Sequence, residues 1–174
     1  MALPDLSPIP TAYSDCCLSL SFPLITHLAS LLPQKPHFTL SIGSGSGLLE
    51  ALITQNFPNV LVEGVEVNSS VNTYIAEQDM NVVTGTWDLS YRATQARAWM
   101  FVYPREPGLV GRYLETHGDG VETILWLGPR VDWGDYEGCF KRSGFEDVSL
   151  HEGEGIGVAE FEILIVVRRS SRLQ

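Results

Sequence analysis

The stretch from Phe38 to Glu50 reads F-T-L-S-I-G-S-G-S-G-L-L-E: a short apolar run, three closely spaced glycines and the start of a second apolar run. Its apolar beginning predicts a buried strand over Phe38–Gly43, and the leucines after the glycines predict a helix over Gly47–Phe57. The three glycines between them permit positive φ angles and a close approach of a ligand to the main chain. The helix start adds unpaired N–H groups and the positive end of a dipole. The stretch therefore predicts a ligand-binding corner at the end of a strand.

Two familiar glycine patterns do not fit this stretch. A dinucleotide-binding fold uses G-x-G-x-x-G, and the sixth position of that pattern is Leu48 here. A phosphate-binding P-loop places a lysine after its last glycine, and no lysine follows these glycines. A structural turn without a ligand stays open as an alternative. Three glycines destabilise a helix start, however, so we expect a further role for them.

Strands and helices alternate along the remainder of the chain. The expected strands are Phe38–Gly43, Asn59–Val67, Met80–Gly85, Ala98–Tyr103, Glu122–Leu127, Phe145–His151 and Glu160–Val167. The expected helices are Leu24–Leu32, capped by Ser21, then Gly47–Phe57, Asn68–Ala76, Leu109–His117 and Asp135–Ser143. This order predicts an α/β fold with a seven-stranded, mostly parallel sheet and helices on both faces. No helix separates the last two strands, so we expect the last strand to be antiparallel.

Length and composition limit the classes of protein. The chain has 174 residues, which favours one domain, and we assign a flexible, proline-rich arm to residues 1–16 and a single domain to residues 17–174. A formal net charge of −10 repels phosphate backbones and anionic lipids, so we expect neither a nucleic-acid partner nor membrane association. The three cysteines, Cys16, Cys17 and Cys139, have no metal-binding spacing and favour reduced thiols, and no metal site is expected. No signal-type segment is present, which favours a cytoplasmic location.

The motif S-I-G-S-G-S-G-L-L-E, together with an acid at the end of the next strand, resembles the first motifs of class I S-adenosylmethionine-dependent methyltransferases. The resemblance covers Phe38 to about Val167. It implies a Rossmann-like fold with an antiparallel seventh strand, S-adenosylmethionine as cofactor, and a glycine loop against the methionine and ribose parts of that cofactor. By this resemblance the expected cofactor-binding residues are Ser41, Gly43, Ser44, Gly45, Gly47, Glu66, Val67, Asn68, Trp87, Asp88 and Tyr103.

Glu66 has a physical reason to belong to that set. It ends the second expected strand, V-E-G-V-E-V, and a carboxylate there can accept hydrogen bonds from both ribose hydroxyls of an adenosine. Glu63 has the opposite strand phase and is the less favoured candidate. A solvent-facing glutamate at a strand end is the alternative for Glu66.

The ends of the third and fourth expected strands keep two interpretations each, and Ser41 departs from the family pattern. Trp87 and Asp88 either flank an adenine and meet its amino group, or are a core tryptophan and a turn aspartate. Tyr103 and Arg105 either border the methyl acceptor, Arg105 meeting a carboxylate, or simply end a strand. The family usually has an acid two residues before the first glycine, where this chain has Ser41.

The sequence thus predicts S-adenosylmethionine-dependent methyl transfer to a small molecule, with no catalytic residue assigned. The alternative is a methyltransferase-like protein that lacks transferase activity and binds the cofactor structurally or serves as a partner subunit. Ser41 and the absence of a substrate motif favour that alternative. The methyl acceptor, the oligomeric state and a protein partner stay open.

Overall fold

The computed structural model describes residues 2–169, and its main feature is a seven-stranded sheet with the strand order β5-β4-β3-β6-β7-β9-β8. The strands of this sheet are β3 (Phe38–Ile42), β4 (Leu61–Glu66), β5 (Met80–Val82), β6 (Ala98–Val102), β7 (Thr123–Pro129), β8 (Asp147–His151) and β9 (Glu162–Arg168). The α-helices are α1 (Phe22–Leu31), α2 (Leu48–Asn56), α3 (Pro107–His117) and α4 (Trp133–Arg142). Short 3₁₀ turns are η1 (Ser69–Val71), η2 (Glu77–Asp79), η3 (Tyr91–Thr94), η4 (Arg130–Asp132) and η5 (Glu154–Ile156).

The strand directions are those that the sequence predicts. Neighbouring strands from β5 to β7 are parallel, and β9 lies antiparallel between β7 and β8. The chain passes from β3 to β4 on one side and returns to β6 on the other, so the order reverses at β3. In open α/β sheets, ligands bind beyond the carboxyl ends of the strands at such a reversal. The fold thus points to the end of β3.

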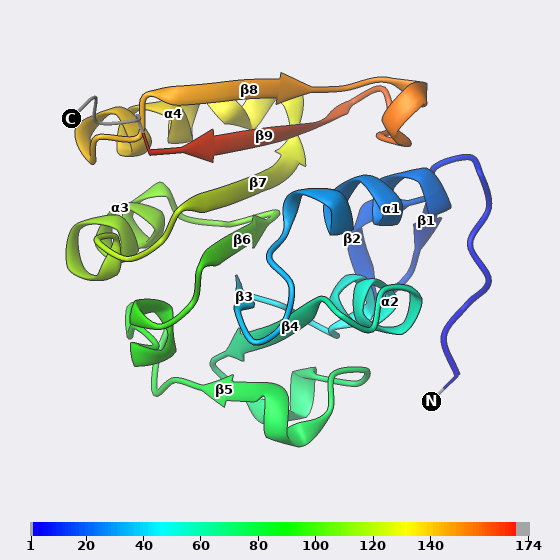
Figure 1. Cartoon of the computed structure of the whole chain (residues 1–174), viewed down its shortest axis with the longest axis horizontal. Helices are drawn as coiled ribbons and strands as arrows, with labels where there is room; N and C mark the ends of the chain where they lie inside the picture. The colour runs from blue at the N-terminus through cyan, green and yellow to red at the C-terminus, as the bar shows by residue number, and fades with distance from the viewer. Residues whose placement is uncertain (1, 170–174) are drawn as a thin grey trace.

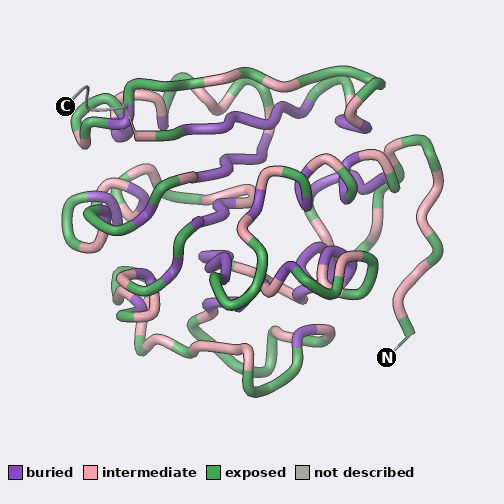
Figure 2. The backbone as a smooth tube through the Cα atoms, in the orientation of Figure 1, coloured by how far each residue is buried: buried purple, intermediate pink, exposed green. Residues whose placement is uncertain are grey.

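Two hydrophobic cores fill the space between the sheet and its helices. Figure 1 shows α1 and α2 on one side of the strands and α3 on the other. Successive residues of a strand face opposite sides, so that in β6 Trp99 packs with the α3 and α4 side while Met100 packs with the α1 and α2 side. The inner strands are buried along their length, whereas β8 at the edge is mostly exposed (Figure 2).

Helix α1 begins as the sequence predicts, at a serine cap. The Ser21 hydroxyl accepts a hydrogen bond from the main-chain N of Leu24 at 3.2 Å and donates one to the carbonyl oxygen of Gly157 at 2.8 Å. The Ser21 side chain therefore caps the start of α1 and links this helix to the turn that precedes β9.

Replacing Ser21 with alanine is expected to lower the free energy of unfolding by about 1–2 kcal/mol. The change removes a helix cap and leaves the buried Gly157 carbonyl without this donor. Denaturant unfolding followed by circular dichroism measures the loss. Ser30→Ala in the same helix is the control, because the exposed Ser30 hydroxyl contacts only the His27 carbonyl. An equal loss in both variants would contradict the assigned cap.

The N-terminal segment differs from the expected irregular arm. A two-stranded antiparallel hairpin, β1 (Thr11–Tyr13) and β2 (Cys16–Leu20), precedes α1, and a boundary between residues 16 and 17 falls inside β2. The hairpin joins the fold because Leu18 and Leu20 are buried in the core on the α1 and α2 side. The run C-C-L-S-L is too short and too weakly alternating to predict this strand from sequence.

The helix expected over Asn68–Ala76 is wrong. Only the 3₁₀ turn η1 forms, and the chain from Asn72 to Ala76 is irregular. The Asn68 side chain accepts a hydrogen bond from the main-chain N of Ser70 at 3.0 Å, and Asn72 bonds both main-chain groups of Ile75. Asparagine side chains that bond to nearby main chain in this way compete with helix formation.

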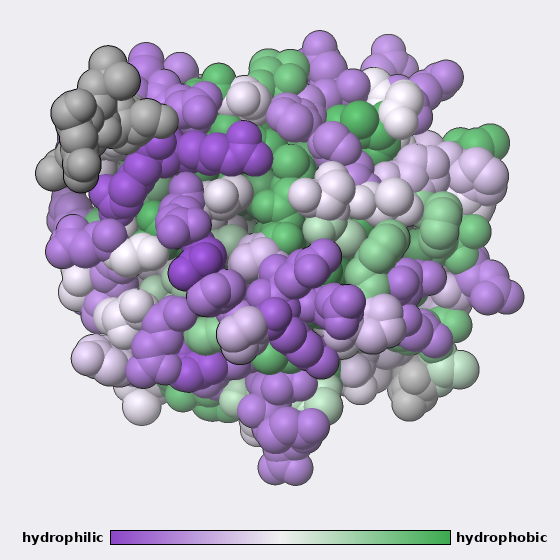
Figure 3. All heavy atoms as spheres, viewed as in Figure 1, coloured by the Kyte–Doolittle hydropathy of each residue, from purple (hydrophilic) through white to green (hydrophobic). Residues whose placement is uncertain are grey.

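One face of the molecule is mainly polar (Figure 3). The face in Figure 3 is largely covered by hydrophilic side chains, with hydrophobic ones showing between them. Within residues 2–169, no helix has both the length and the apolar character needed to cross a bilayer.

Candidate functional site

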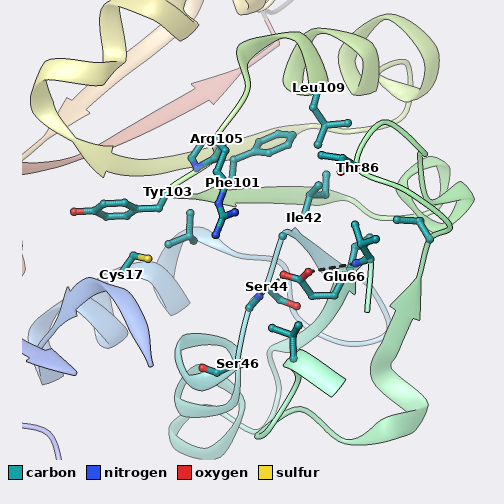
Figure 4. Close-up of a pocket in the computed structure, with 18 of the residues that line it drawn as sticks. Cys17, Ile42, Ser44, Ser46, Glu66, Thr86, Phe101, Tyr103, Arg105 and Leu109 are labelled. Atoms are coloured by element: carbon teal, nitrogen blue, oxygen red, sulfur yellow. Dashed lines mark hydrogen bonds between the residues drawn. The ribbon is translucent and has the colours of Figure 1, made fainter. Parts of the chain in front are cut away.

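A cavity of about 480 Å³ opens at the carboxyl ends of β3, β4 and β6 (Figure 4). Its volume lies in the range of small-molecule sites. The glycine loop and the start of α2 form one side, the segments after β5 and β6 form the opposite side, and the β1–β2 turn closes one end. Of the residues expected to bind a cofactor, those that line it are Gly43, Ser44, Gly45, Glu66, Val67, Asn68, Asp88 and Tyr103. Ser41, Gly47 and Trp87 do not line it.

The three motif glycines have two different roles. All have left-handed φ angles, +80° at Gly43, +60° at Gly45 and +80° at Gly47. A Cβ added at Gly43 or Gly45 would meet no atom within 4 Å, whereas one at Gly47 would lie 2.6 Å from Cγ1 of Ile75. The first two glycines therefore leave open space beside the cavity that side chains would fill, and the third is required for packing.

Glu66 holds the loop while it faces the cavity. Its Oε1 accepts a hydrogen bond from the main-chain N of Gly45 at 2.7 Å, and Oε2 accepts a longer one from the N of Val67 at 3.3 Å. A carboxylate has about four acceptor positions, so acceptor capacity is left for a ligand. Asn68, directly beyond, uses its side-chain oxygen to cap η1.

Ser44 contributes to the loop mainly through its main chain. The N–H groups of Gly43 and Ser44 both donate to the carbonyl oxygen of Val65, at 2.9 and 3.2 Å. The Ser44 hydroxyl lies where a Cβ on Gly64 would approach it to 2.5 Å, so a glycine in β4 lets the loop sit close to the sheet.

The wall opposite the glycine loop is largely apolar. Phe101, Leu109 and Thr86 form this wall in Figure 4, and the Arg105 side chain extends between it and the loop. An apolar wall of this kind suits an aromatic ring or a short aliphatic chain.

Of the neighbours Trp87 and Asp88, only Asp88 lines the cavity. The Trp87 side chain is 49% exposed and lies against Gly108 of α3, outside the cavity. Asp88 lines the cavity, but its carboxylate accepts hydrogen bonds from the main-chain N and hydroxyl of Thr84, which hold the pKa of Asp88 below its ordinary value. Asp88 therefore has the hydrogen bonds of a turn aspartate and also lines the cavity, so both interpretations of this residue stay open.

Tyr103 lies at the hairpin end of the cavity. It is the one described non-glycine residue with a left-handed φ, +49°, and its hydroxyl donates to the carboxylate of Glu162. Glu162 also accepts from the main-chain N of Ser19 in β2 at 3.1 Å. Burial and the neighbouring carboxylate raise the pKa of Tyr103 well above its ordinary value. Tyr103 therefore anchors the hairpin and is a weak candidate for a base.

Sequence reasoning missed Glu50, which lines the cavity from the first turn of α2. Its side chain accepts a hydrogen bond from the hydroxyl of Ser41 at 2.8 Å, and both residues are buried. The hairpin residues Asp15, Cys16 and Cys17 were missed as well. The run L-L-E-A-L-I signals only a helix, and nothing in it indicates that the acid faces the sheet.

Comparison with known proteins identifies the fold. No family model and no curated protein matches the sequence. Solved structures do match: precorrin-6y C5,15-methyltransferase from Geobacter metallireducens has a TM-score of 0.65 at 12% identity, over 95% of this chain and all of the other. S-adenosylmethionine-dependent methyltransferase SibL has a TM-score of 0.59 at 15% identity, over 83% of this chain and 54% of the other. Human N-acetylserotonin methyltransferase, solved with S-adenosylmethionine, has a TM-score of 0.57 at 15% identity, over 86% and 51%.

These matches establish the architecture. The chain has the Rossmann-like fold of the class I S-adenosylmethionine-dependent methyltransferases, as its glycine motif predicts. It spans about half the length of SibL and of the human protein. The matched proteins act on different acceptors by their names, so the fold does not select one.

Proposed function

We propose that this protein binds S-adenosylmethionine and transfers its methyl group to a small-molecule acceptor. One observation carries the proposal: two left-handed glycines, Gly43 and Gly45, leave open space at the carboxyl end of β3, with the Glu66 carboxylate beside them. This arrangement offers a close approach to main chain and an acceptor for sugar hydroxyls in one cavity.

The residues present fit such a cofactor. Glu66 would accept hydrogen bonds from the ribose hydroxyls, and Gly43 and Gly45 would lie against the methionine part. Val67, Asn68 and the opposite apolar wall would enclose the adenine. When bound, S-adenosylmethionine supplies an electrophilic methyl group on a sulfonium, and this chain's residues position the partners and exclude water.

A small acceptor fits the charge of the chain better than a nucleic acid does. The net charge of −10 opposes a phosphate backbone, although one matched structure is named a putative tRNA methyltransferase. Among the described residues that line the cavity, Arg105 is the one basic residue, so a single carboxylate on the acceptor would have a partner there.

Replacing Glu66 with alanine is expected to weaken binding of S-adenosylhomocysteine by about 1.5–3 kcal/mol, roughly ten- to 150-fold in the dissociation constant. The substitution removes charged acceptors for the ribose and frees the Gly45 N–H. Isothermal titration calorimetry measures the change.

Glu63 provides a matched control on the same strand. Its carboxylate is bound by Arg92 and by Asn81, and it does not line the cavity. Glu63→Ala is expected to lower stability and leave ligand affinity unchanged. An unchanged dissociation constant in Glu66→Ala would show that Glu66 is misassigned.

The alternative, a methyltransferase-like protein without transferase activity, also has an observation in its favour. The hydroxyl of Tyr103, at the end of β6, donates to Glu162, and its raised pKa keeps it protonated, so it is a poor candidate for a general base. Incubation with labelled S-adenosylmethionine and a broad panel of small acceptors separates the two candidates. Labelled product supports transfer, whereas tight binding without any product supports the alternative.

A further inference from the structure

Glu50 is a buried acid with no cationic partner. Its side chain is 2% exposed at the floor of the cavity, and no ion pair among residues 2–169 includes it. The hydroxyl of Ser41, on the neighbouring strand β3, donates to its Oε1 at 2.8 Å. Burying a carboxylate without a positive partner is costly, so a group placed in this way calls for an explanation.

The environment of Glu50 shifts its pKa toward neutral pH. Burial raises its pKa to about 7, the nearby Glu66 adds to the rise, and hydrogen bonds from its own main chain and from Ser41 offset part of it. Besides Glu66, Glu50 interacts with Cys16 on β2, whose pKa is raised to about 12 by burial and then by Glu50, so this thiol stays neutral. Proton exchange in this part of the cavity near neutral pH therefore involves Glu50.

Glu50 lies beside the position at which this chain departs from the motif. Strand β3 places a serine at position 41, where the acid of the resembled motif is expected. That serine points to Glu50 in the first turn of α2, so the helix brings a carboxylate to the end of the strand that lacks one. Glu50 and Glu66 lie on the two sides of the glycine loop and line the same cavity.

We propose that Glu50, oriented by Ser41, binds the ammonium group of the ligand's amino-acid part, and that this binding displaces a proton from Glu50. This assignment rests on the proposed function, since it concerns the same cavity. The ammonium arrives with its charge, the carboxyl releases its proton to solvent, and the buried site becomes a neutral pair. Ser41 acts as a positioning residue, because it contacts Glu50 rather than the cavity.

Two nucleosides test the inference by calorimetry. S-adenosylhomocysteine carries the amino-acid part, and 5′-methylthioadenosine has the same nucleoside without it. Glu50→Gln is expected to weaken the first about ten- to hundredfold and to leave the second unchanged, because only the first carries the ammonium. An equal loss for both, or no loss for the first, would overturn the assignment.

A pH series gives an independent readout. Wild-type affinity for S-adenosylhomocysteine is expected to rise about tenfold from about pH 6 to about pH 8 as Glu50 loses its proton, and this dependence is expected to vanish in Glu50→Gln. Ser41→Ala is expected to move the midpoint of the wild-type profile to higher pH, which a purely structural role would not do. A profile that persists in Glu50→Gln contradicts the inference.

Different results would overturn the assignment of Glu50 and the proposed function. If the wild type binds both nucleosides and Glu50→Gln binds them equally well, the assignment of Glu50 is overturned and the proposed function stands. If the wild type binds neither nucleoside, the proposed function fails and the assignment fails with it.

Discussion

Replacing Glu50 with glutamine is expected to raise the free energy of unfolding by about 3 kcal/mol above pH 7. The folded-state pKa of Glu50 is about 7 against an ordinary value of 4.5, so the folded protein holds a proton that the unfolded chain releases. The contribution of Glu50 to wild-type stability therefore falls as the pH rises from about 4.5 to about 7, and then levels. Glutamine has the same shape and no charge, so the variant avoids this loss and keeps an acceptor for Ser41.

Denaturant unfolding of both proteins between about pH 4 and about pH 8 checks the prediction. The two proteins are expected to have similar stability at the acid end, where Glu50 is neutral, and to diverge above it. Glu122→Gln, at a side chain 64% exposed, is the control and is expected to show no such divergence. A glutamine variant that is less stable than the wild type at high pH would contradict the prediction. The expected gain in stability and loss of affinity form a trade-off of the kind common at binding sites.

Replacing Gly47 with alanine is expected to lower the free energy of unfolding by roughly 2–4 kcal/mol. Its φ of +80° is unfavourable for a residue with a Cβ, and that Cβ would lie 2.6 Å from Cγ1 of Ile75 and 2.9 Å from Oδ1 of Asn72. Neither atom is the free end of a flexible chain, since Asn72 is hydrogen-bonded to the main chain of Ile75. The substitution therefore displaces the segment that supports the loop.

Gly45→Ala is the matched comparison. Its Cβ would meet nothing within 4 Å, so only the left-handed φ is unfavourable and the loss of stability is expected to be about 1 kcal/mol. The same Cβ would occupy cavity space, so this variant is expected to lose most of its affinity for S-adenosylhomocysteine. Thermal unfolding and calorimetry on both variants test the division of roles. A Gly45→Ala variant that binds as well as the wild type would show that the loop does not contact the ligand.

Much of the fold can be predicted from the spacing of apolar residues and from the glycines and prolines that end helices and strands. The run Phe38–Gly43 and the helix after it were predicted because apolar spacing and glycine punctuation agree there, and β9 was predicted antiparallel because no helix separates it from β8. The helix expected over Asn68–Ala76 does not form, because the side chains of Asn68 and Asn72 accept hydrogen bonds from nearby main-chain N–H groups. The composition of this segment indicates that effect only weakly.

A site residue could be predicted from the sequence only where a residue with suitable chemistry stands at the end of an expected strand. Glu66 ends a strand and faces the cavity, so its position followed from strand phase. Glu50 lies on a helix, and which side of α2 faces β3 depends on tertiary packing that the local sequence does not encode. The position of Trp87 depends on tertiary packing as well, because the loop after β5 turns its side chain toward Gly108 of α3.

Calorimetric titration of the purified wild-type protein with S-adenosylhomocysteine and, separately, with NAD is the most direct test of the central claim. The fold and the cradle formed by Gly43, Gly45 and Glu66 predict saturable binding of one molecule of S-adenosylhomocysteine per chain and weaker or no binding of NAD. No binding of S-adenosylhomocysteine, or tighter binding of NAD, would contradict it.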